Sequence, residues 1–99
     1  MVGHFAVEYV YTADTAKRDE VRPAHRAFLS AQKGEGEGGV RLLASGPWTN
    51  DTGALLLFEA EDEAALRAVL EHDPFAEADL VSRVRINVWN PVLGPWVAG

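Results

Sequence analysis

The order of the apolar patterns along the chain is the feature that most limits its fold. Four segments read as strands, because they alternate at every second position or form short apolar runs between turn residues: 4–12, 40–48, 54–60 and 83–90. Two segments have apolar residues at helical spacing: 15–33 and 61–73. The resulting βαββαβ order predicts a ferredoxin-like α+β fold, an antiparallel sheet with both helices on one face.

The sheet face without helices is expected to be apolar. Ala6, Val10 and Trp89 lie on this face, and the strand at 54–60 is apolar on both of its faces, as a central strand is. A soluble protein rarely leaves such a surface bare. We therefore expect a homodimer in which the open sheet faces of two copies pack together.

Pro23 interrupts the first helical pattern. Proline lacks the N–H of a helix interior but suits the first helical position. We therefore expect a break near Arg22 and a main helix that starts at Pro23. In that helix His25 shares the apolar stripe with Phe28 and Leu29.

The length, net charge and composition of the chain limit the class of protein to which it can belong. The 99 residues are expected to form one domain, 1–99. The net charge of −6 and the lack of a basic run argue against binding to nucleic acid or to a membrane surface. The chain has no cysteine, which excludes disulfides and thiolate catalysis. No stretch resembles a membrane span or a signal peptide, so the cytoplasm is the expected compartment.

The run Gly34–Gly39 alternates glycine with glutamate before a final glycine pair. It follows a helix and lacks the Lys and the Ser or Thr of a phosphate-binding loop. It is therefore predicted to be a linker.

Three histidines are the candidate proton-transfer groups, because imidazole titrates near neutral pH. Only His25 is predicted to point inward. His72 is expected in solvent at a helix end. His4 and Glu8 share a strand face but lie about 13 Å apart, too far to bind one metal ion. We expect no metal and no cofactor.

Asp73 precedes Pro74, a pair that is typical of a helix start. Its carboxylate is expected to accept the N–H of Phe75 or Ala76 and to keep an oxygen for a histidine. A lone core histidine is more often structural, whereas a paired carboxylate would fix its tautomer for acid–base work. We predict that Asp73 meets His25.

Ser45, Gly46 and Pro47 do not suit the interior of a strand. They predict either a bulge that ends the strand or the wall of a pocket, and the sequence leaves both open.

Taken together, several motifs resemble those of the YciI-like (YCII-related) proteins. They are Arg22–His25 (RPAH), Leu42–Pro47 (LLASGP), Asp73–Phe75 (DPF) and the closing Trp89–Pro91 (WNP). The resemblance covers about residues 5–93 and implies a dimeric α+β barrel with a His–Asp site. On this resemblance the site residues are His25 and Asp73 as catalytic residues and Arg22, Ser45, Gly46 and Pro47 as substrate-binding residues.

At least one member of that family is a dehydrochlorinase that acts on a chlorinated hydroxyhydroquinone without a redox cofactor. The resemblance therefore implies a cofactor-independent lyase or isomerase that moves a proton on a small activated organic molecule. Two alternatives stay open: a small-ligand binding or sensing module without turnover, and a purely structural His–Asp pair.

Overall fold

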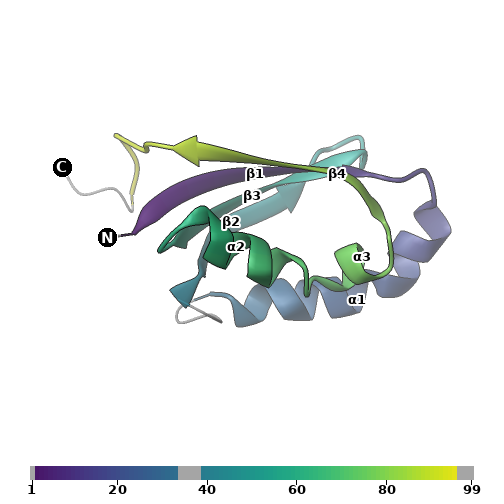
Figure 1. Cartoon of the computed structure of the whole chain (residues 1–99). Coiled ribbons are helices and arrows are strands. Elements are labelled where there is room, and N and C mark those ends of the chain that lie inside the picture. The colour runs from purple at the N-terminus through teal and green to yellow at the C-terminus, as the bar shows by residue number, and fades with distance from the viewer. Residues whose placement is uncertain (1, 34–38, 96–99) are drawn as a thin grey trace.

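The computed structural model describes residues 2–33 and 39–95, and in this part a four-stranded antiparallel sheet carries three helices on one face (Figure 1). The elements are β1 (Gly3–Tyr11), α1 (Thr15–Ala31), β2 (Arg41–Pro47), β3 (Gly53–Ala60), α2 (Glu63–Leu70), α3 (Pro74–Glu77) and β4 (Val81–Trp89). The strand order is β2-β3-β1-β4. The predicted ferredoxin-like α+β fold is confirmed, and α3 is a short addition to it. Residues 34–38 of the predicted linker lie outside the described residues.

The core lies between the sheet and the helices. On β1, Phe5, Val7 and Tyr9 face the helices and are buried, as their period-two spacing predicts. β3 lies between β2 and β1, which explains why its sequence is apolar on both faces. From the helices, Leu29 of α1 and Leu66 of α2 complete the packing.

The alternating apolar residues of β4 lie on the helix-bearing face, but two of them are exposed. Val84 and Val88 do lie opposite Tyr9 and Phe5, on the helix-bearing face. Val84 is nevertheless 41% exposed and Val88 80% exposed. β4 is an edge strand, and these side chains are open to solvent although they lie on the helix-bearing face.

α1 is continuous, and the predicted break near Arg22 is wrong. The helix contains Pro23 in its interior. Pro23 and Asp19, whose carbonyl loses its N–H partner, are both exposed, so water can solvate that carbonyl. The buried residues of the helix are Arg18, His25 and Leu29. Their contacts hold the helix in one piece, and His25 therefore lies well inside it.

β2 is irregular where it approaches α1. Its pairing with β3 shifts between Leu42 and Ala44, which marks a bulge. After the shift, Ser45 lies opposite Leu56, a buried residue on the helix-bearing face. The bulge does not end the strand, because β2 continues to Pro47.

The second helical region is shorter than the predicted range 61–73, because α2 covers only Glu63–Leu70. Asp62 caps α2 by accepting the N–H of Ala65 at 2.8 Å. The chain then turns at Asp73 into α3, with Pro74 in the first turn. Within the described residues, no helix is long and apolar enough to cross a membrane.

Candidate active site

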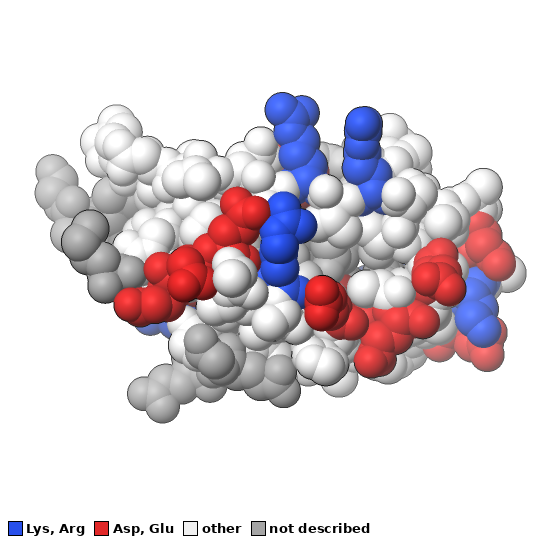
Figure 2. All heavy atoms as spheres, viewed as in Figure 1, with Lys and Arg blue, Asp and Glu red and all other residues white. Residues whose placement is uncertain are grey.

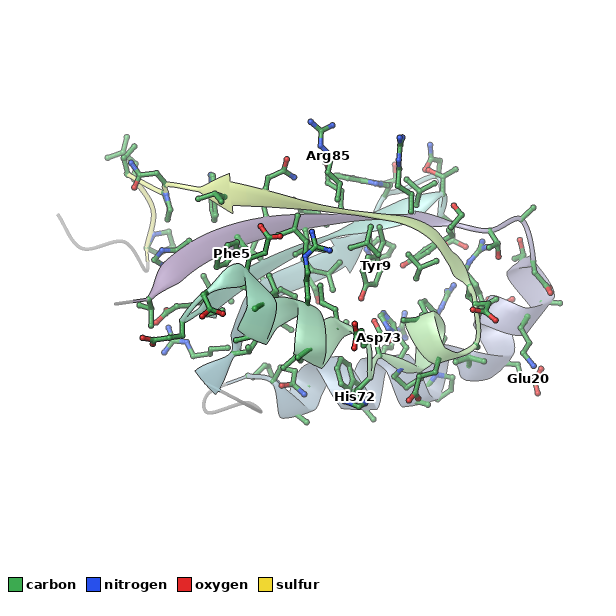
Figure 3. The ribbon with its side chains drawn as sticks, viewed as in Figure 1. Phe5, Tyr9, Glu20, His72, Asp73 and Arg85 are labelled. Carbon is green, nitrogen blue, oxygen red and sulfur yellow. The ribbon has the colours of Figure 1, made fainter. Side chains whose placement is uncertain are left out.

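Asp73 is the centre of the candidate site and is fully buried. Three donors from three different elements reach its carboxylate. Oδ1 lies 2.7 Å from Nδ1 of His25 and accepts the backbone N–H of Phe75 at 2.9 Å, while Oδ2 accepts the hydroxyl of Tyr9 at 2.9 Å. Figure 3 shows Tyr9 reaching from the sheet toward Asp73. Three donors suit an ionised carboxylate, which only accepts hydrogen bonds.

This network assigns the tautomer of His25. Because an ionised Asp73 cannot donate, Nδ1 of the imidazole is the donor in their contact. In the neutral imidazole the proton-accepting nitrogen is then Nε2. His25 is only 7% exposed, yet it contributes to the wall of a cavity. His25 therefore lines the cavity while Asp73 holds one of its two ring nitrogens.

Aromatic packing fixes the plane of that imidazole. The Phe75 ring stacks on it with centroids 3.9 Å apart and planes 1° from parallel. Tyr11 in turn packs edge-on against Phe75, with centroids 5.5 Å apart. Rotation of His25 out of this stack would break both the ring contact and the bond to Asp73.

Tyr9 acts as a donor because its hydroxyl stays protonated. Burial raises the pKa of Tyr9 well above its usual value, and the negative charge of Asp73 raises it further. Burial also raises the pKa of Tyr11, although the nearby Arg22 opposes that shift.

A cavity of about 270 Å³ opens beside His25, between α1 and the β2–β3 edge. All four predicted substrate-binding residues line it: Arg22, Ser45, Gly46 and Pro47. Asp73 is not among the lining residues and lies behind the imidazole, so it can act on a bound molecule only through His25.

A cluster of charges at the β2–β3 turn holds the first half of α1 against the sheet. Arg18, only 4% exposed, donates to the carbonyl of Thr12 and contacts the Asp51 carboxylate at 3.3 Å. Arg22 lies 3.6 Å from Asp51 and 3.6 Å from Asp19. This cluster fixes where α1, and with it His25, lies relative to β2 and β3.

The other two histidines lie away from the cavity. His72 is exposed beyond the end of α2 (Figure 3). His4 lies 3.9 Å from Glu59. Over residues 2–33 and 39–95, no three His, Asp or Glu side chains cluster closely enough to bind a metal ion.

Three site residues were not predicted from sequence: Tyr9, Tyr11 and Arg26. The Phe75 N–H was expected at Asp73, but the stacking of the Phe75 ring on His25 was not predicted. A signal existed for Tyr9, since it continues the buried face of Phe5 and Val7 and a buried phenol requires a partner. No local pattern indicates that this partner is Asp73, because 64 residues separate the two.

Solved structures share this fold. One is 5-chloro-2-hydroxyhydroquinone dehydrochlorinase (TftG) from Burkholderia phenoliruptrix AC1100 in complex with 2,5-dihydroxybenzoquinone, with 25% identity over 88% of this chain and 93% of that chain and a TM-score of 0.74. Rv0793 from Mycobacterium tuberculosis has 14% identity over 96% and 99% of the chains and a TM-score of 0.56. A mutant of SnoaB, a cofactor-independent oxygenase from Streptomyces nogalater, has 16% identity over 96% and 97% and a TM-score of 0.51. The last two likenesses concern the fold alone.

No curated protein sequence matches this chain. The model of one domain family does match, and it covers residues 4–90, nearly the whole chain. His25, Asp73 and the residues that line the cavity all lie within the matched range. The chain therefore belongs to the YCII-related domain family.

Proposed function

We propose that this protein is a cofactor-independent acid–base enzyme in which His25 transfers a proton. The observation that carries the proposal is the pairing of His25 Nδ1 with buried Asp73 at 2.7 Å on the wall of a cavity. Asp73 fixes the tautomer and balances the charge when His25 becomes protonated. Arg22, Ser45, Gly46 and Pro47 bind the substrate.

The proposed reaction is an elimination or an isomerisation. Nε2 of His25 accepts a proton from a hydroxyl or an acidic C–H of the substrate. The electron pair of that bond forms a new double bond, and in an elimination the leaving group departs with the electrons of its own bond. In an isomerisation His25 returns the proton at another atom. Neither reaction requires an oxidant or a reductant. Acid–base catalysis contributes about 10²–10⁴ in rate, which suits substrates that are already activated.

The size and lining of the cavity support a small ring compound as substrate. Its volume of about 270 Å³ is below the roughly 300–1,000 Å³ typical of drug-sized ligands. Apolar groups such as Leu29, Leu56 and Phe75 can pack on a ring, and Ser45 and Arg22 can bind its oxygens. The dehydrochlorinase with the same fold was crystallised with 2,5-dihydroxybenzoquinone, a molecule of this kind.

A non-catalytic ligand-binding or sensing role is the alternative. It is favoured by the deep burial of His25, which is only 7% exposed and stacked on Phe75. A group so enclosed can bind a polar atom of a ligand without exchanging its proton with solvent.

Three variants separate these functions, with chloride release from 5-chloro-2-hydroxyhydroquinone as the first assay. We expect His25→Ala and Asp73→Asn to lower turnover at least about 100-fold. The matched control His72→Ala removes an exposed imidazole and should leave turnover unchanged. Chloride release that is unaffected in His25→Ala would refute the catalytic role. Binding of 2,5-dihydroxybenzoquinone with no turnover of any activated ring substrate would favour the sensing role.

We further propose that the protein is one cytoplasmic domain, 1–99, and forms a homodimer through its open sheet face. On that face Ala6, Leu55 and Leu57 are apolar, and no helix of the described chain covers them (Figure 1). Glu8 and Arg85 lie on the same face, 3.9 Å apart. An apolar centre with charges near it is typical of a surface that a second copy covers.

A further inference from the structure

The charged side chains that line the cavity are all basic. The lining contains two guanidinium groups, one imidazole, a serine and a tyrosine hydroxyl, but no carboxylate from the described residues. This contrasts with the molecule as a whole, which carries a net charge of −6. Figure 2 shows acidic side chains spread along the helix-bearing half of the molecule. The described side chains that line the cavity thus include two cations and no anion, although the protein is acidic, and this lining favours an anionic ligand.

The two guanidinium groups of the cavity differ in how their charge is balanced. Arg22 lies within 3.6 Å of both Asp19 and Asp51, so two carboxylates already offset its charge. Arg26 has no ion pair and no hydrogen bond from its guanidinium to any residue in 2–33 or 39–95. Of the two, Arg26 therefore has the more available charge and hydrogen-bond donors.

The position of Arg26 suits contact with a molecule bound at His25. It follows His25 directly on α1 and lies one turn after Arg22. It lines the same cavity and is exposed to solvent. A guanidinium presents a planar set of donors that can bind two oxygens of one anion, which a hydroxyl such as that of Ser45 cannot do.

We propose that Arg26 is the residue that selects the substrate, by binding an ionised oxygen of a small ring compound. The ligand class is a ring with an ionised hydroxyl or a carboxylate, oriented so that its reactive proton faces His25. Arg22 then serves chiefly to hold α1 against the Asp51 turn while it lines the same wall. This inference rests on the proposed function, because it names the substrate class of that site.

The test is binding of two matched probes, measured by titration calorimetry without turnover. The anionic probe is 2,5-dihydroxybenzoquinone, and the neutral probe is 2,5-dimethoxybenzoquinone, which has the same ring but no ionisable hydroxyl. We expect Arg26→Gln to weaken binding of the anionic probe about five- to tenfold, a moderate loss because water partly screens an exposed charge. Binding of the neutral probe should not change, and Arg26→Lys should recover part of the loss.

Arg67→Gln is the control, since it removes an equal charge from α2. Arg67 does not line the cavity, and it pairs with Glu63 at a distance of 2.8 Å. It should leave binding of both probes unchanged. Equal weakening of both probes by Arg26→Gln, an equal effect of Arg67→Gln, or no binding of the anionic probe to the wild-type protein would overturn the proposal.

The same titrations keep this proposal distinct from the enzymatic one. Suppose that the wild-type protein turns over no substrate and that His25→Ala still binds the anionic probe. These results would end the catalytic proposal and leave the role of Arg26 intact. If Arg26→Gln shows normal turnover and unchanged probe binding, the role of Arg26 would be refuted and the catalytic proposal would stand.

Discussion

Tyr9→Phe tests whether the Asp73 network stabilises the fold. The change deletes one hydroxyl and keeps the ring that packs in the core. That hydroxyl is the only donor to Oδ2 of Asp73 within the described chain, at 2.9 Å, and both residues are at most 1% exposed. Water therefore has little access to replace it. A hydrogen bond to a charged group contributes about 1.5–3 kcal/mol.

We expect the free energy of unfolding to fall by about 2 kcal/mol in Tyr9→Phe. For a domain of this size each kcal/mol shifts Tm by about 4–8 °C, so Tm should fall by about 8–16 °C. Urea unfolding followed by tryptophan fluorescence measures the loss, and an unchanged m-value would show that the unfolded state is unaffected.

Tyr11→Phe is the matched control. The Tyr11 hydroxyl has no hydrogen-bond partner among residues 2–33 and 39–95, and Tyr11 lines the cavity. Its removal should change stability by less than about 0.5 kcal/mol. A Tyr9→Phe protein as stable as Tyr11→Phe would refute the reasoning, because Oδ2 of Asp73 would then need no protein donor.

The remaining predictions concern pH, a glycine and the dimer. Because burial raises the pKa of Tyr9 and Tyr11 above the usual value of about 10, the folded chain keeps protons that the unfolded chain loses. Stability is thus complete below about pH 10 and falls as the pH rises further, and urea titrations should show a smaller fall in Tyr9→Phe. Gly53→Ala should lower the free energy of unfolding by at least about 2 kcal/mol in thermal unfolding, since its Cβ would lie 2.0 Å from the Tyr9 carbonyl oxygen. In the control Gly46→Ala the new Cβ meets open space, and the stability should stay within about 0.5 kcal/mol of wild type. Sedimentation should show a dimer that Leu57→Asp dissociates, and a monomeric wild-type protein at micromolar concentration would contradict the proposed interface.

Local sequence was enough to predict the fold and the position of Asp73 at a helix start in the candidate site. The alternation of Phe5, Val7 and Tyr9 assigned β1 and its buried face, because side chains of a strand alternate between faces whatever they pack against. Asp73 before Pro74 predicted a helix start and its cap for a similar reason, since both effects act within a few residues.

Features that depend on neighbours distant in sequence were predicted less well. Pro23 does not end α1, because contacts of His25 and Leu29 outweigh the local cost of proline and the freed carbonyl faces water. Alternation places Val88 on the helix-bearing face opposite Phe5, but it is 80% exposed, since burial depends on whether a helix covers that strand.

The sequence by itself determined the order of the elements, the apolar faces and the residue types available for acid–base chemistry. Only the tertiary structure decided that the Tyr9 hydroxyl joins His25 and the Phe75 N–H at one buried carboxylate. It also decided that Arg26 shares a cavity with His25 while its charge stays unpaired within the described chain. The reason is physical: periodicity and capping act over a few residues, whereas burial and charge pairing depend on which distant segments the fold brings together.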